Sequence, residues 1–131
     1  MRRLAIYAGL ALLASGCANV PPEVRAAQQK KLDETTPVCR SDKECEAKWA
    51  AARSWILNHA GMKLRIITPE YMETYGSISS EIAVAVQKVP TGNGTYVLAV
   101  KTWCNQMNMM GCVPDQFEAA QSFNDAVNNV K

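Results

Sequence analysis

The sequence predicts an α+β domain in which two helices enclose a short series of antiparallel strands. Helical periodicity is present after residue 40 and again after residue 114, and the residues between alternate apolar and polar side chains. The turn sequence Gly92-Asn93-Gly94 divides the alternating region and is typical of a β-hairpin. With 131 residues, 48% of them hydrophobic, the chain can form one packed core. We therefore expect a disulfide-stapled α-β-β-β-α domain, with a three-stranded antiparallel meander and both helices on one face.

The first helix of this domain is predicted over residues 41–60. Ser41 with Glu44 three positions later has the spacing of a capping box. Trp55 falls outside the apolar stripe of this helix, and Gly61 is expected to end the helix in a left-handed conformation. The stripe recurs at helical spacing and consists of Cys45, Trp49, Ala52 and Ile56.

Three strands are predicted between the helices. Residues 63–68 and 82–89 show two-residue alternation, and residues 95–103 are rich in β-forming side chains, so the last two strands form the hairpin. Segment 69–76 has two interpretations, because Pro69 disfavours a strand while its tyrosines favour one. We expect the sheet face away from the helices to be partly exposed and able to bind. Its predicted residues include Ala83, Ala85, Lys88 and Lys101.

The second helix is predicted to begin at Pro114-Asp115. Asp115 and Glu118 repeat the spacing of a capping box. Apolar side chains then recur at intervals of three and four residues, so this helix also presents one apolar face. They are Phe117, Ala120, Phe123, Val127 and Val130.

Residues 1–16 are predicted to be a signal peptide rather than part of the fold. Arg2 and Arg3 precede an uncharged apolar stretch of eleven residues, which is too short to span a bilayer. The stretch ends in Leu13-Ala14-Ser15-Gly16-Cys17. Small residues before a cysteine resemble the lipobox of bacterial lipoproteins. This resemblance implies cleavage before Cys17 and attachment of diacylglycerol and an N-acyl chain (such as palmitate) to that residue, which together make a stable anchor.

The resemblance also suggests a location. Ala18 stands where many lipoproteins retained at the inner membrane carry aspartate, so we expect the periplasmic side of the outer membrane. Residues 17–37 are predicted to be a lipidated tether, and residues 38–131 the globular domain. Val24 and Leu32 are the only large apolar side chains within the tether segment 23–34, so a helix there is expected to be transient.

Four cysteines are left once Cys17 is assigned to the anchor. Because the periplasm is oxidising, an even number of cysteines predicts two disulfides. Of three possible pairings we expect Cys39–Cys45 and Cys104–Cys112, each closing a short loop. The alternative joins the N-terminal pair to the C-terminal pair. Spacings of five and seven intervening residues do not suit a zinc site, and no CxxC motif for redox catalysis is present.

Charge and residue types exclude several classes of function. Removing Arg2 and Arg3 leaves twelve basic and twelve acidic residues, so no global attraction for nucleic acid is expected. The single histidine, His59, is expected to cap or cover the end of a helix. Glu70 and Glu73 are expected to be solvated rather than a glycosidase pair. We therefore expect neither enzymatic activity nor a cofactor.

The sequence favours a binding module that is anchored in the membrane and contacts an envelope protein or the cell wall. One alternative is a Cu(I) site, because Met107, Met109 and Met110 place three thioethers within four residues. Such methionines more often pack in the core or form adaptable contact surfaces. The other alternative is an inhibitor of a cell-wall hydrolase, an occupation known among small periplasmic lipoproteins.

Overall fold

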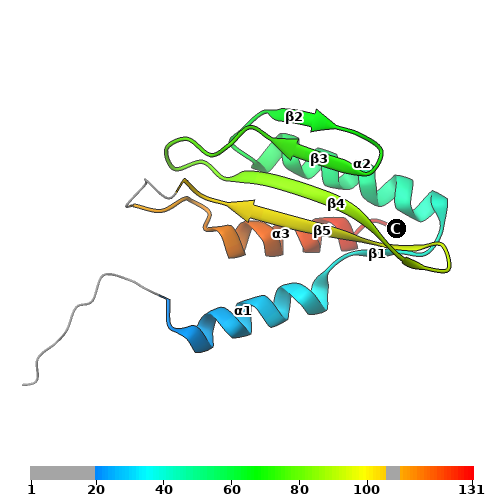
Figure 1. Cartoon of the computed structure of the whole chain (residues 1–131), viewed down its shortest axis with the longest axis horizontal. Coiled ribbons are helices and arrows are strands. Elements are labelled where there is room, and N and C mark those ends of the chain that lie inside the picture. The colour runs from blue at the N-terminus through cyan, green and yellow to red at the C-terminus, as the bar shows by residue number, and fades with distance from the viewer. Residues whose placement is uncertain (1–19, 106–109) are drawn as a thin grey trace, which may run out of the picture.

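The computed structural model describes residues 20–105 and 110–131, which form an α+β fold (Figure 1). Its elements are α1 (Pro22–Thr35), β1 (Val38–Cys39), α2 (Asp42–His59), β2 (Leu64–Ile67), β3 (Tyr71–Thr74), β4 (Ala83–Gly92), β5 (Thr95–Trp103) and α3 (Gln116–Asn128). The strands in the described residues form one antiparallel sheet in the order β1-β5-β4-β3-β2. The predicted α+β class is confirmed, and the predicted three-stranded meander matches the sheet only in part.

Two strands beyond the three predicted ones enlarge the sheet: β1, and β3 in the segment that the sequence left open. β3 lies between β2 and β4, so β2 does not neighbour β4 as a three-stranded meander required. Pro69 does not prevent β3 because it precedes the strand, in a turn where the Thr68 N–H donates to the Tyr71 carbonyl at 2.8 Å. β1 has two residues, too few to show alternation, and pairs with Tyr96 and Val97 of β5.

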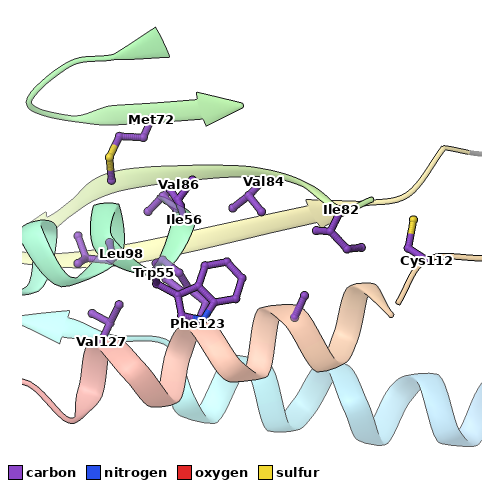
Figure 2. Close-up of a cluster of buried hydrophobic side chains, with 12 residues drawn as sticks. Trp55, Ile56, Met72, Ile82, Val84, Val86, Leu98, Cys112, Phe123 and Val127 are labelled. Atoms are coloured by element: carbon purple, nitrogen blue, oxygen red, sulfur yellow. The ribbon is translucent and has the colours of Figure 1, made fainter. Parts of the chain in front are cut away.

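The hydrophobic core lies between one face of the sheet and helices α2 and α3 (Figure 2). Met72 of β3 and Leu98 of β5 are fully buried there, together with Val84 and Val86 of β4. The helices bury small and large side chains against them, so both predicted helices lie on the same face of the sheet. These are Ala52, Trp55 and Ile56 of α2 and Ala119, Phe123 and Val127 of α3.

The apolar face of α2 is wider than the predicted stripe. Trp55, which we placed outside the stripe, is only 4% exposed. Its ring packs edge-on against Phe123 and is stacked with His59, and its Nε1 donates to Ser122 Oγ at 3.1 Å. Trp55 is therefore a core residue that joins α2 to α3. His59 covers it from the end of the helix.

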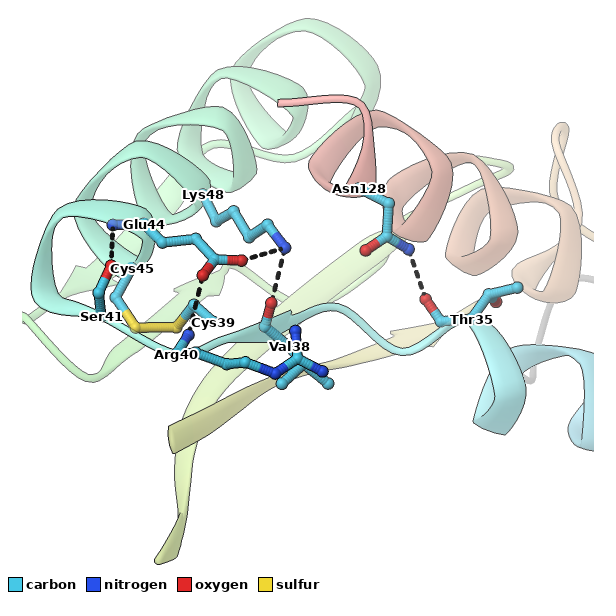
Figure 3. Close-up of polar contacts among 9 residues, drawn as sticks. All are labelled: Thr35, Val38, Cys39, Arg40, Ser41, Glu44, Cys45, Lys48 and Asn128. Atoms are coloured by element: carbon cyan, nitrogen blue, oxygen red, sulfur yellow. Dashed lines mark hydrogen bonds and ion pairs between the residues drawn. A yellow bond between two sulfur atoms is a disulfide. The ribbon is translucent and has the colours of Figure 1, made fainter. Parts of the chain in front are cut away.

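The start of α2 is tied to β1 by a polar cluster (Figure 3). Ser41 Oγ accepts the N–H of Glu44 at 3.1 Å, but the Glu44 carboxylate accepts the N–H of Arg40 at 3.0 Å instead of that of Ser41. The predicted capping box is thus half formed here. Lys48 Nζ, which is buried, lies 3.0 Å from Glu44 Oε1 and donates to the Val38 carbonyl at 2.6 Å. α3, by contrast, has the complete predicted capping box.

The end of α2 is not the left-handed glycine cap that the sequence predicted. Ala60 ends the helix in an extended conformation, and its N–H donates to the Ile56 carbonyl at 3.0 Å. Gly61 serves a different purpose, because a Cβ at this position would lie 2.6 Å from the Cβ of Glu81. Glycine here lets the chain after α2 lie directly against the chain entering β4.

Both disulfides have the pairing that we expected. Cys39–Cys45 joins β1 to the first turn of α2, with the two Cα atoms 5.1 Å apart. Cys104–Cys112, with a Cα separation of 5.8 Å, closes the segment between β5 and α3. Each disulfide therefore holds the chain entering a helix against the sheet.

The segment predicted to be a tether contains helix α1, which contacts α3. Asn124 Nδ2 donates to the Leu32 carbonyl at 3.2 Å and to Thr35 Oγ1 at 3.1 Å, and Asn128 Nδ2 donates to the Thr35 carbonyl at 2.7 Å. Amide side chains of α3 thus hold the last turn of a helix that buries none of its own residues. Residues 1–16 and Cys17 lie outside the described residues. Within residues 20–105 and 110–131, no helix combines the length and apolar character required to cross a bilayer.

Candidate functional site

The sheet face opposite α2 and α3 carries a trough with a floor of small side chains. Ala83 and Ala85 of β4 are only 0% and 8% exposed, although they alternate with the core residues and so point away from the helices. Larger side chains of the two flanking strands cover them. Trp103 of β5 lies opposite Ala83, while Lys101 of β5 and Glu73 of β3 lie opposite Ala85 on its two sides. We call this surface the open trough; its residues are Tyr71, Glu73, Ala83, Ala85, Gln87, Ala99, Lys101 and Trp103.

Two adjoining hollows make up the open trough. The larger, of about 470 Å³, is lined by Tyr71, Glu73, Ala85, Lys101 and Trp103. The smaller, of about 220 Å³, shares three of these residues and extends along the strands past Gln87 and Ala99. The larger volume falls within the range of small-molecule sites and also suits one or two side chains of a protein partner.

One residue predicted on this face lies on the other. Lys88 lies two and four residues after Val86 and Val84 in β4, and it is paired with the core residue Leu98. Its side chain is therefore on the helix-covered face of the sheet. Its Nζ lies 4.5 Å from the ring centroid of Tyr96. Ala83, Ala85 and Lys101 do lie on the open face, as the sequence predicted.

Glu73 is the fixed charge of the open trough. Its carboxylate accepts hydrogen bonds from the Tyr71 hydroxyl and from the Arg65 guanidinium. The Tyr71 hydrogen bond, followed by that of Arg65, holds the pKa of Glu73 below its ordinary value. The same hydrogen bond raises the pKa of Tyr71. Arg65 lies on β2, the neighbour of β3, where the register between the two strands is irregular between Leu64 and Ile66.

This geometry suits contacts with a partner. A carboxyl with a lowered pKa remains an anion at neutral pH and is poorly matched to proton donation. Lys101 adds a cation on the opposite wall, and its Nζ lies 6.0 Å from the Trp103 ring centroid. The open trough thus offers one anion, one cation and two aromatic rings. Among the residues that the structure describes, no group of His, Cys, Asp and Glu is arranged to hold a metal ion.

Several predicted residues do not contribute to the open trough. Glu70 precedes β3, so it is separated from Glu73. Met107 and Met109 lie outside the described residues, and Met110 is 91% exposed. Because Cys104 and Cys112 are joined, neither is a free thiol next to these methionines, which weakens the Cu(I) hypothesis.

Sequence reasoning did not place five of the trough residues on the open face: Tyr71, Glu73, Gln87, Ala99 and Trp103. Trp103 has the same parity as Lys101, so extending the alternation of the last strand by two residues would have found it. Tyr71 could be placed on this face only if residues 71–74 were predicted to be a strand. A comparison of the chain with family models, curated proteins and solved structures finds no match. The trough geometry therefore carries the functional assignment.

Proposed function

We propose that this chain is a lipid-anchored binding module of the bacterial cell envelope and that its open trough holds a protein or cell-wall partner. The proposed location is the periplasmic side of the outer membrane, attached through Cys17. The observation that carries the proposal is the trough itself, in which alanines leave room between Trp103 and Tyr71 and between the charges of Glu73 and Lys101. Aromatic side chains beside a recess are typical of the anchor residues of binding interfaces, and polar and charged side chains are typical of their rims.

The rigidity of the trough supports a binding role. Its floor belongs to β4, a central ten-residue strand with neighbours on both sides. Glu73 is held by two donors from different positions, so a partner meets a prearranged charge rather than one it must order. The lipobox pattern supports the proposed location independently of the trough.

Photo-crosslinking in intact cells tests the proposal. A photoreactive amino acid at Gln87, which is exposed in the smaller hollow, is expected to crosslink a partner. The same group at Arg53, an exposed position of α2 on the other side of the molecule, is the control. A discrete protein adduct identifies a protein partner. Co-sedimentation of the purified chain with peptidoglycan sacculi identifies a cell-wall partner.

A variant whose trough is filled by a larger side chain tests the same proposal through loss of partner binding. Ala85→Arg places a long side chain over the floor and is expected to reduce crosslinking from Gln87 to the level seen from Arg53. Ala50→Arg makes the same change at an exposed position of α2 and should leave crosslinking unchanged. Intact disulfides and an unchanged circular dichroism spectrum show that both variants fold. Equal crosslinking from Gln87 and Arg53, or an A85R variant that behaves as the wild type, would refute the proposal.

A further inference from the structure

Exposed apolar side chains gather at one end of the molecule. Ile78, in the loop between β3 and β4, is 64% exposed, and Met110 and Val113, between β5 and α3, are 91% and 85% exposed. The two loops are joined, because the Val113 N–H donates to the Ser80 carbonyl at 3.3 Å. The Cys104–Cys112 disulfide constrains the second loop further. We call Ile78, Met110 and Val113 the apolar tip.

The chain enters the described structure at the same end. α1 runs parallel to α3, since Thr35 at the end of α1 contacts Asn128 at the end of α3, while Gln28 and Phe117 line one groove near the start of α3. From Gln28 back to Pro22, α1 continues for six residues, or about 9 Å. Figure 1 shows the first turn of α1 at the end of the long axis where the β3–β4 loop and the β5–α3 segment lie, opposite the β4–β5 turn.

The sequence distance to Cys17 is short. Four residues lie between Cys17 and Pro22, so the five steps of a fully extended chain reach at most about 18 Å. A lipid on Cys17 therefore keeps the start of α1, and with it this end of the molecule, near the bilayer. Val20 and Val24, at the start of the described chain, are 38% and 45% exposed and add apolar surface there.

We propose that the apolar tip inserts into the lipid headgroup region, which orients the domain on the membrane that holds its anchor. This inference rests on the proposed lipidation of Cys17. Exposed apolar side chains are stabilised at the boundary between headgroups and acyl chains. The flanking side chains Glu81 and Asp115 are exposed and acidic, so the tip favours a zwitterionic surface over an anionic one.

Fluorescence quenching by brominated lipids tests the contact. The lipidated full chain, purified from bacterial membranes, is reconstituted in vesicles of phosphatidylethanolamine and phosphatidylcholine whose phosphatidylcholine acyl chains are brominated. Val113→Trp adds a reporter to the tip, and Thr91→Trp adds one at the β4–β5 turn. Fluorescence added by V113W is expected to be quenched several-fold more than that added by T91W. Met110→Trp is a second tip reporter in case V113W misfolds.

The outcomes separate this inference from the proposed function. If mass spectrometry finds diacylglycerol and an N-acyl chain on Cys17 but the tip reporters are quenched no more than T91W, the tip does not touch lipid and only the inference fails. If Cys17 is unmodified, the proposed anchor fails and the inference fails with it. A tip variant, Ile78→Ser with Val113→Ser, should make the T91W reporter more accessible to the brominated lipid, because the domain loses its fixed orientation.

Discussion

At the scale of single residues, the open trough depends on how Glu73 is held. One carboxylate oxygen accepts a hydrogen bond from the Tyr71 hydroxyl, and the other accepts one from the Arg65 guanidinium. These bonds fix the orientation of the Glu73 side chain. Lys101, across the floor from Glu73, is restrained less: in the part of the chain that the structure describes, its Nζ lies 6.0 Å from the Trp103 ring centroid. A partner therefore meets one rigid wall and one adaptable wall. Adaptable cations beside aromatic rings are suited to partners that bring a carboxylate or other anion.

The Tyr71–Glu73 hydrogen bond is directly testable. Glu73→Gln removes the carboxylate whose hydrogen bond to the hydroxyl is the largest cause of the raised pKa of Tyr71, so this pKa should fall toward its ordinary value of 10.0. Titration of isotope-labelled tyrosine rings followed by NMR measures the change. Glu70→Gln removes a neighbouring carboxyl that makes no such bond, and it should leave the pKa of Tyr71 where it is in the wild type. Equal effects of E73Q and E70Q would show that Tyr71 is not bonded to Glu73.

At the scale of elements, local signals found α2, α3 and the β4–β5 hairpin. Each has its own caps, turn residues or periodicity, which act within a few residues of sequence. β1 and α1 carry no comparable signal. β1 is a strand because it pairs with the edge of β5. The last turn of α1 is held by hydrogen bonds from the side-chain amides of Asn124 and Asn128 in α3. Long-range contacts of this kind cannot be inferred from a single sequence.

The same reasoning explains how much of the open trough could be predicted. Ala83, Ala85 and Lys101 were placed on the open face by alternation alone. The prediction for Lys88 was wrong, because strict alternation along β4 puts Lys88 on the same face as Val84 and Val86. The pairing of Glu73 with Arg65 depends on the insertion of β3 beside β2, which is not visible as a pattern of apolar residues.

The junction between β1 and α2 gives a prediction at this scale. Lys48→Met removes the ammonium group that donates to the Val38 carbonyl and pairs with Glu44, and the carbonyl loses its charged donor. We expect the free energy of unfolding to fall by about 1–3 kcal/mol, the usual effect of losing a hydrogen bond to a charged group. Urea denaturation measures it. Lys43→Met, at an exposed position five residues earlier, should change the free energy of unfolding by less than about 0.5 kcal/mol. Similar losses for K48M and K43M would contradict the structural role of Lys48.

At the scale of the whole molecule, the trough and the apolar tip point in different directions. β4 and β5 run along the long axis, and the tip lies at one end of that axis, so the trough faces sideways from it (Figure 1). A domain seated on lipid by its tip would leave the trough free for a partner. Binding to a partner and contact with the membrane are therefore expected to be independent, and A85R should leave the quenching of V113W unchanged.

The pH dependence of global stability follows from two carboxyls whose folded-state pKa values are lowered. In Glu44 the cause is chiefly the Arg40 N–H and then Lys48, and in Glu73 it is Tyr71 and then Arg65. Between the lowered values and the ordinary value of 4.5, the unfolded chain binds more protons than the folded one, so stability rises with pH in that window. Both contributions are complete above the ordinary value and are lost as the pH falls through the folded values.

Urea midpoints measured from about pH 7 down to about pH 3 should therefore fall on acidification in the wild type. Glu44→Gln and Glu73→Gln should each lower the midpoint at neutral pH and make the fall on acidification smaller, because the variant side chain no longer titrates. Glu70→Gln, which removes a carboxyl without these donors, should keep the wild-type slope. If E44Q and E73Q both retain the slope of E70Q, acid sensitivity arises elsewhere in the chain, and neither carboxylate contributes to folding in the way that its hydrogen bonds indicate.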